Sequence, residues 1–165
     1  MRCLLFLLIF PVIFAKVPTA ALFPTKVEAQ NVVVKYLTTK ILNGPKNGAA
    51  YVSIYNGNQF PVTLYKVKVT PEVFDRVELH DHIERTDVNG NKYMEMIEIP
   101  EMEIAPGQTL FLAPGSKHLM LMGIKPTYCG EKTLTFKFSF RKNSRETFDI
   151  SVEIPVVKDS PRCGE

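Results

Sequence analysis

The chain has 165 residues and a formal net charge of +3, from 20 Lys and Arg against 17 Asp and Glu. This length predicts one domain whose core is large enough to fold without metals or disulfides. Basic and acidic residues are interspersed along the chain, which argues against a basic face for nucleic acid or for an anionic membrane surface.

The first fifteen residues, MRCLLFLLIFPVIFA, have the features of a secretory signal peptide. Arg2 precedes a thirteen-residue apolar run, and small residues follow it. A membrane-spanning helix needs about 20 apolar residues, whereas Pro11 and Lys16 interrupt this run. We therefore expect export, with cleavage after residue 15, 21 or 29. Loss of residues 1–15 removes only Arg2 and leaves a charge of +2.

Two cysteines, Cys129 and Cys163, remain after such a cleavage. In an oxidising compartment they either form a disulfide that ties the C-terminal tail to the body or stay as two free thiols. No histidine lies near either of them in the sequence, so a nucleophilic role has no support. We expect a flexible tail over residues 158–165.

Alternation of apolar and polar residues predicts β-strands throughout the mature chain, and no stretch has a helical period. The clearest strand is TLTFKFSF at 133–140, followed by the polar hairpin connection RKNSRE and the strand TFDISVEI at 147–154. The first of these strands directs Leu134, Phe136, Phe138 and Phe140 inward, and the second directs Phe148, Ile150, Val152 and Ile154 inward. Further strands are predicted at 31–37, 50–55, 62–69, 77–83, 93–99, 109–112 and 118–122.

Turn signals separate these strands, because Asn and Gly tolerate positive φ and Pro presets a corner. Asn-Gly occurs at 43–44, 47–48, 56–57 and 89–90, and Pro-Gly at 106–107 and 114–115. Eight or nine short, mostly antiparallel strands with such turns predict a Greek-key β-sandwich or barrel over residues 30–157.

Histidine and methionine cluster in one part of the sequence. All three histidines and five of the six methionines fall between residues 80 and 122. They come in pairs two positions apart, so each pair projects from one face of a strand. The pairs are His80 with His82, Met94 with Met96, and His118 with Met120, after which Met122 follows.

Imidazole and thioether groups together favour Cu(I) over hard cations and over zinc. These ligands are neutral, so the site buries no carboxylate, and thioethers survive in an oxidising compartment. Imidazole must be deprotonated to bind a metal, so affinity should fall as the pH drops through about 6.5. The alternative is that the methionines fill gaps in the core and the histidines have no role.

The spacing M-x21-H-x-M from Met96 to Met120 resembles the motif H-x10-M-x21-H-x-M of the PCuAC family of periplasmic copper chaperones. Other segments that resemble the family are AAYVSIYN at 49–56, VELH at 77–80, MEM at 94–96, LAPGSKHLMLMGIK at 112–125 and LTFKF at 134–138. The resemblance implies that His80, Met96, His118 and Met120 bind Cu(I), with His82, Met94 and Met122 as neighbours.

One departure from the motif lies between the first histidine and Met96. Fifteen residues separate His80 from Met96 and thirteen separate His82 from it, where the family has ten. A longer hairpin at residues 86–91 accounts for this, because the free-energy cost of closing a loop rises only slowly with its length. The "ELH" context favours His80 as the ligand, but His82 shares its facing direction and stays an alternative.

The resemblance further implies a cupredoxin-like β-sandwich that acts in the bacterial periplasm as a Cu(I) metallochaperone and not as an enzyme. Its partners would be periplasmic proteins that donate or accept copper, such as the subunit of cytochrome c oxidase that holds the dinuclear copper centre. An electron-transfer copper site would add a cysteine thiolate, and no cysteine lies within residues 80–122.

Two other functions fit parts of the pattern. A hydrolytic zinc site would use His80, His82 and Glu84, although methionines are poor zinc ligands. An exported adhesion or protein-binding module would use Met94, Met96, Met120 and Met122 as core or as a docking surface. Tight binding of one Cu(I) would distinguish a copper chaperone from both.

Overall fold

The computed structural model describes residues 26–41, 47–125, 128 and 133–157. The predicted signal peptide, the Asn-Gly pair at 43–44, both C-terminal cysteines and the tail 158–165 lie outside these residues. Within them the chain forms eleven strands and no helix, so no helix of the described part is able to cross a membrane. The strands are β1 (Lys26–Ala29), β2 (Val32–Ile41), β3 (Asn47–Asn56), β4 (Val62–Thr70), β5 (Phe74–Thr86), β6 (Lys92–Glu98), β7 (Met102–Ile104), β8 (Thr109–Leu112), β9 (His118–Ile124), β10 (Thr133–Arg141) and β11 (Thr147–Val157).

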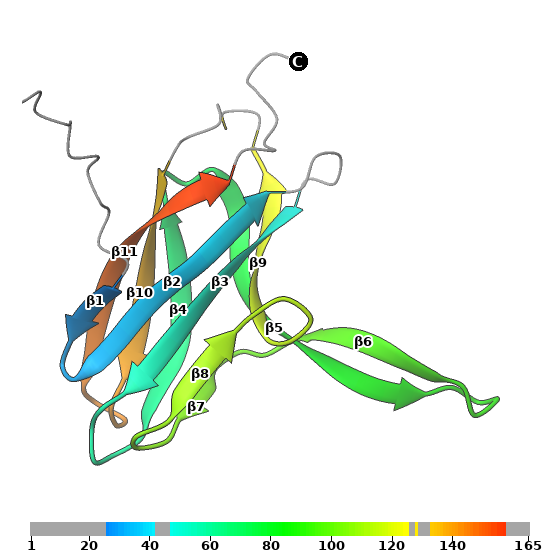
Figure 1. Ribbon diagram of the computed structural model, residues 1–165, viewed down its shortest axis with the longest axis horizontal. Helices are drawn as coiled ribbons and strands as arrows, with labels where there is room; N and C mark the ends of the chain where they lie inside the picture. The colour runs from blue at the N-terminus through cyan, green and yellow to red at the C-terminus, as the bar shows by residue number, and fades with distance from the viewer. Residues whose placement is uncertain (1–25, 42–46, 126–127, 129–132, 158–165) are drawn as a thin grey trace, which may run out of the picture.

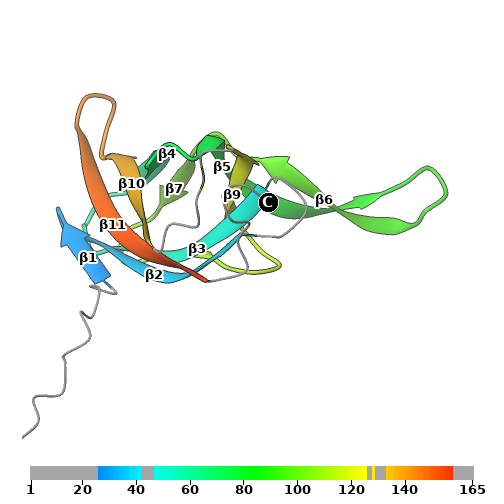
Figure 2. The same ribbon diagram turned by 90° about the horizontal axis from the view of Figure 1, so that it is seen from above.

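The strands form two packed layers, which Figure 2 shows from above. One layer has the order β6-β5-β9-β3-β2, with β1 paired to β2 and β8 paired to β3; the other has the order β11-β10-β4-β7. A short parallel pairing of β11 with β2 joins the two layers, and every other pair is antiparallel. This arrangement confirms the predicted cupredoxin-like β-sandwich, to which β1 and β7 add two short strands.

The core lies between the layers, where the alternation of each strand directs its apolar residues. On β10 the four predicted inward residues are all fully buried, and on β11 Ile150, Val152 and Ile154 are buried beside them. The other layer contributes Val34, Val52, Ile54, Leu112, Leu119 and Leu121. Each such side chain stabilises the fold by about 1.5–3 kcal/mol relative to exposure. The other face of the β5–β9–β3 region therefore points outward.

One predicted turn is wrong. Asn47 and Gly48 begin β3, where Asn47 pairs with Met122 and Gly48 pairs with both Ile41 and Leu121. Pairing on both sides overrides the local preference of Asn-Gly for a turn. Of the other four described signals, Asn56–Gly57 lies at the end of β3 and three lie in loops, where Gly90, Gly107 and Gly115 adopt positive φ of 84°, 69° and 74°.

The hairpin of β5 and β6 extends well beyond the body of the sandwich (Figure 1). Its tip is the turn at residues 87–91, which confirms the long hairpin expected there. Asp87 organises this tip, because its carboxylate accepts hydrogen bonds from the backbone N–H groups of Asn89 and Asn91 at 2.8 Å and from the Asn91 side chain at 3.0 Å. The Asn91 side chain is the main reason why the pKa of Asp87 lies below its usual value.

Candidate metal centre

The outer face of β6, β5 and β9 gathers all four predicted ligands. In the strand register His80 lies opposite His118, and Met96 lies opposite His82. Met120 lies opposite Glu78. Residues that face each other in an antiparallel pair point to the same side. The structure therefore brings three imidazoles and two thioethers to one face, while the intervening Leu79, Leu119 and Leu121 point into the core.

A hydrogen bond defines which ring nitrogen of His118 carries the proton. Its side chain is only 6% exposed, and its Nδ1 lies 2.9 Å from the carbonyl oxygen of Ser116. A carbonyl oxygen only accepts, so Nδ1 must donate and Nε2 carries the lone pair. The ring centre lies 5.9 Å from that of His80 and 6.5 Å from that of Tyr51. Burial raises the pKa of Tyr51, which keeps its phenol protonated.

In His80 the other ring nitrogen, Nε2, carries the proton. Its Nε2 lies 2.7 Å from Oε2 of Glu78, and this hydrogen bond is the largest cause of the lowered pKa of Glu78, with Arg76 as a further cause. The ionised carboxylate only accepts, so Nε2 donates and the lone pair belongs to Nδ1. That Nδ1 is buried and has no hydrogen-bond partner among the described residues.

An unpaired buried acceptor costs about 1–3 kcal/mol, and a bound metal ion would satisfy it. Pairing of one ring nitrogen with a carboxylate is also how metal-binding histidines are commonly oriented. The donors of this face therefore fit a metal with a preference for nitrogen and sulfur.

The methionines of β6 are not part of the core. Met96 is 45% exposed and Met94 is 59% exposed, whereas Met120 and Met122 on β9 are half-buried. Among the methionines that the structure describes, only Met102, on β7 in the other layer, packs against the core. The gap-filling interpretation therefore does not describe Met94 or Met96.

The alternative zinc site of His80, His82 and Glu84 does not form. Glu84 is exposed and pairs with Lys92 at 2.8 Å, near the free end of the hairpin. Across the described residues, no group of three or more His, Cys, Asp or Glu side chains is arranged to hold a metal.

A family model matches residues 27–154 of this chain, and its description is that of LpqE-like lipoproteins. The chain belongs to the LpqE-like family. Lipoproteins are exported, so membership of the family indicates an exported protein. Among curated proteins no significant match to the chain was found.

Solved PCuAC domains share the fold of this LpqE-like protein. The copper-bound PCuAC domain from PmoF2 is 15% identical, with a TM-score of 0.58, and the match covers 79% of this chain and 96% of that one. The apo PCuAC domain from PmoF1 is 20% identical, with a TM-score of 0.56, and the match covers 82% and 99% of the two chains. The likeness to the PCuAC family that the motifs predicted is confirmed at the level of the fold.

An ion pair fixes the two strands of the LpqE-like chain at the site. Lys117, the residue before His118, pairs with Asp81 at 2.8 Å, and the same carboxylate accepts the backbone N–H of His82 at 2.8 Å. The hydrogen bond from Lys117 is the main reason why the pKa of Asp81 is lowered. Asp81 lies between the two histidines in the sequence and on the other face of β5, and its ion pair aligns β5 with the start of β9.

Glu78 and Ser116 orient the histidines but were not among the residues predicted from the sequence. Glu78 had a usable signal, because it is two positions before His80 and therefore shares its face. The role of Ser116 could not be predicted, because it acts through its backbone carbonyl, which every residue type has.

Proposed function

We propose that this protein is a periplasmic metallochaperone that binds one Cu(I) and delivers it to a copper-accepting protein, toward the dinuclear copper centre of cytochrome c oxidase. The ligands in this proposal are Nδ1 of His80, Nε2 of His118 and the thioether sulfurs of Met96 and Met120. The copper-bound PCuAC domain from PmoF2, whose fold this chain shares, supports copper as the cargo.

The observation that carries the proposal is the buried Nδ1 of His80. Its ring is turned by Glu78 so that the nitrogen with the lone pair is the one without a partner among the described residues. His118 lies directly opposite with its own lone pair on Nε2. Two oriented neutral imidazoles beside thioethers form a donor set that selects Cu(I).

The exposure of Met96 supports transfer of the ion instead of permanent storage. This ligand belongs to the edge strand β6 and is 45% exposed, whereas His118 is buried. A partner can therefore approach from the Met96 side and replace the thioethers before the imidazoles. No catalytic step is part of this function.

Cu(I) competition tests the proposal. The change of Met96 or Met120 to Leu should weaken Cu(I) binding by more than about tenfold, because each removes one soft ligand, while the free energy of unfolding changes by less than about 1.5 kcal/mol. Affinity is measured against a Cu(I)-specific chelator, and stability by urea unfolding.

The matched control is Met102→Leu, which makes the same chemical change in the other layer. It should leave Cu(I) affinity unchanged. An equal affinity of wild type and the Met96 and Met120 variants would remove these methionines from the site, and absence of tight Cu(I) binding by wild type would favour a protein-binding module. X-ray absorption of the Cu(I)-loaded protein should count about two sulfur and two nitrogen neighbours.

Delivery has its own test. Cu(I)-loaded protein mixed with an apo dinuclear-copper domain of an oxidase should lose its copper to that domain. Retention of copper would contradict the proposed acceptor but not the binding of Cu(I).

A further inference from the structure

The outer edge of β6 has no neighbouring strand among the residues that the structure describes. β6 ends its layer and pairs with β5 alone, and Figure 1 shows the two strands projecting together from the body. The strand has seven residues. Backbone N–H and C=O groups along such an edge can pair with a strand of another chain. The β6 edge is therefore a place where a further strand can be added.

The hydrogen bonds of the hairpin identify which backbone groups lie at this edge. The register of β5 with β6 is continuous, and the N–H of Ile99 donates to the carbonyl of Leu79 at 2.7 Å at one end, as that of Asp87 does to Asn91 at 2.9 Å at the other. Hydrogen-bonded pairs alternate along an antiparallel ladder, so the odd-numbered residues of β6 bond to β5. The backbone groups of the even-numbered residues point away from β5. These residues are Lys92, Met94, Met96 and Glu98.

The side chains along the β6 edge complement a second copy of the same edge. Lys92 and Glu98 are exposed at its two ends, and Met94 and Met96 are 59% and 45% exposed between them. When two copies of β6 run antiparallel with Glu95 opposite Glu95, Lys92 of each copy faces Glu98 of the other. In the same register Met94 faces Met96. All seven residues then have an opposite residue, and the outward backbone groups of the two copies face each other.

Charge selects this register among those that the backbone allows. A shift by two residues in either direction keeps the outward backbone groups opposite one another but removes both ion pairs, so that Lys92 faces Met96 or Glu98 faces Met94. The like charges at the centre are compensated within each copy. Glu95 points to the other face of the sheet, and its Oε2 pairs with Nε of Arg85 at 2.7 Å.

We propose that the β6 edge is the interface of a homodimer, in which the two copies of β6 pair antiparallel with Lys92 of each opposite Glu98 of the other. A two-fold interface of this kind repeats every contact twice. The pairing lies in the plane of the sheet, so it leaves open the outer face to which the thioethers point. The dimer does not depend on copper or on the function proposed above.

The first test uses sedimentation equilibrium of the apo protein, with a thiol reductant present so that no disulfide links two chains. The fraction of wild-type dimer should rise with concentration. Glu98→Lys sets like charges opposite each other at two points and should weaken dimerisation by at least about tenfold. Addition of Lys92→Glu to this variant restores opposite charges and should return the affinity to within about threefold of wild type. The control is Glu153→Lys, the same charge change at an exposed position of β11, which should have no effect.

The second test places a thiol on the two-fold axis. In a chain whose native cysteines are changed to Ser, Glu95→Cys brings two thiols together, because the Cα atoms of this non-hydrogen-bonded pair would lie about 4.5 Å apart, within the range for a disulfide. Mild oxidation should therefore link two copies. Tyr93→Cys is the matched control on the same face, since its equivalents would lie four positions apart, roughly 13 Å along the strand, and should not link.

Wild type that stays monomeric up to about 1 mM would overturn the homodimer. A dimer that Glu98→Lys does not weaken would show that another surface joins the copies. Failure of the double charge reversal to restore the dimer, or linking by Tyr93→Cys in place of Glu95→Cys, would contradict the register. Each of these results leaves the Cu(I) proposal standing, because Cu(I) competition measures it separately.

Discussion

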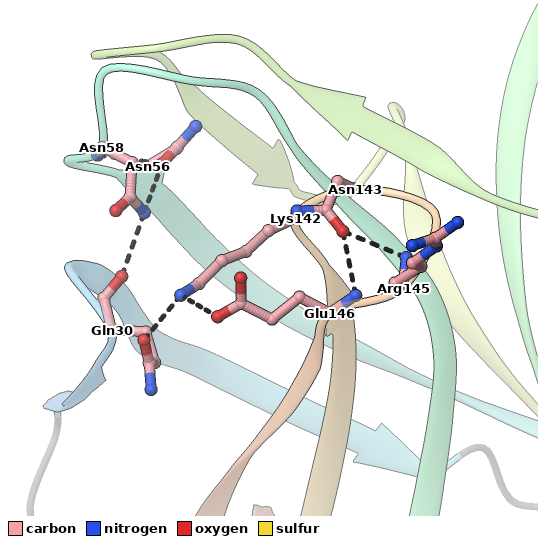
Figure 3. A network of polar contacts seen from close by, with 7 residues as sticks. All are labelled: Gln30, Asn56, Asn58, Lys142, Asn143, Arg145 and Glu146. Atoms are coloured by element: carbon pink, nitrogen blue, oxygen red, sulfur yellow. Dashed lines mark hydrogen bonds and ion pairs between the residues drawn. The ribbon is translucent and has the colours of Figure 1, made fainter.

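Two polar clusters of this sandwich use hydrogen bonds in opposite ways. The first, which we call the asparagine cluster, consists of Gln30, Asn56, Asn58, Lys142 and Glu146, and Figure 3 shows it together with Asn143 and Arg145. Asn56 is fully buried. Its amide nitrogen donates to the carbonyls of Phe60 and Ile104 at 2.9 Å, and its oxygen accepts the backbone and side-chain N–H groups of Asn58 at 3.0 Å.

The asparagine cluster joins loops that are far apart in the sequence. Asn58 donates to the carbonyl of Gln30 in the β1–β2 turn at 3.0 Å. Lys142, at the β10–β11 hairpin, donates to the Gln30 side chain and to Glu146, both at 2.7 Å. Every hydrogen-bonding position of the Asn56 amide is used, so this buried side chain has no capacity left for a ligand.

The second cluster, which we call the histidine cluster, consists of His80, His82, His118 and Met96. It differs from the asparagine cluster in burial and in hydrogen bonding. Nδ1 of His80 is buried and unpaired within the described chain, two imidazoles share one carbonyl, and Met96 is exposed beside them. Buried polar groups are nearly always hydrogen-bonded, and each exception needs an explanation. The difference teaches that a saturated polar cluster stabilises the fold, whereas an unsaturated one retains donor atoms for a ligand.

The largest predicted effect is on the free energy of unfolding, and it comes from a change in the asparagine cluster. Asn56→Ala leaves the buried carbonyl of Ile104, the part-buried carbonyl of Phe60 and two N–H groups of Asn58 without their partner, and should lower the free energy of unfolding by about 3 kcal/mol. Cu(I) affinity of the folded fraction should not change. Urea unfolding and Cu(I) competition on the same sample measure both quantities.

A control for this prediction is Asn143→Ala. Asn143 also accepts two backbone N–H groups, those of Arg145 and Glu146, but it does so in an exposed turn. Water replaces these bonds, so the loss should stay below about 1 kcal/mol. An equal loss for both variants would show that burial does not set the strength of the asparagine cluster.

The next largest effect should be the loss of Cu(I) affinity caused by Glu78→Gln in the histidine cluster. The neutral amide accepts more weakly than the carboxylate and also donates through its nitrogen, so it no longer fixes the His80 tautomer. Loss of such a partner typically weakens metal binding by about 10-fold to 100-fold. Cu(I) affinity should fall by at least about tenfold, and nitrogen NMR should show that the His80 ring loses its preference for protonation on Nε2.

Glu84→Gln is the matched control for Glu78→Gln. Glu84 faces the same side of β5 but pairs with Lys92 near the tip of the hairpin. Its replacement should change neither Cu(I) affinity nor the His80 tautomer. If Glu78→Gln weakens copper while the tautomer stays as in wild type, Glu78 acts by charge and not by orienting the ring.

Much of the fold could be predicted from the sequence, because apolar and polar residues alternate wherever one face of a strand is buried. The inward residues of β10 and β11 are the clearest case. The strands β1 and β7 have four and three residues, which is too short for a recognisable period, and their pairing with β2 and β4 defines them instead. The Asn47–Gly48 error has the same origin, because a partner strand decided the conformation.

The site was predictable in part for a similar reason. The i, i+2 spacing fixes which side chains share a face of one strand, and this parity is correct for every histidine and methionine pair. That β5 lies between β6 and β9 depends on non-local pairing, which no pattern in the sequence specified. The orientation of His80 by Glu78 and of two rings by Ser116 depends on side-chain rotamers, which no sequence period encodes. Whether His80 or His82 binds Cu(I) stays a prediction.

A shortened hairpin should have a smaller effect than either cluster. Removal of Arg85, Thr86, Lys92 and Tyr93 deletes two cross-strand pairs and keeps the pairing of His82 with Met96 in register. Because the turn at 87–91 is retained and loop length is lenient, Cu(I) affinity should change by less than about threefold. Removal of Arg85 alone is the control, since a one-residue slip turns Met96 to the other face and should weaken Cu(I) binding strongly.

The smallest effect should come from Asp81→Asn, which breaks the ion pair with Lys117 beside the histidine cluster. The pair is partly exposed, so the loss at pH 7 should stay below about 1 kcal/mol. Because the folded pKa of Asp81 is lowered, the carboxylate stabilises the fold above the ordinary value of about 3.9 and loses this effect as the pH falls through the folded value. The difference between wild type and variant should therefore shrink between pH 5 and pH 3 in urea unfolding. A difference that stays constant over this range would contradict a role of the Asp81 charge, because the amide oxygen of Asn can still accept the backbone N–H of His82.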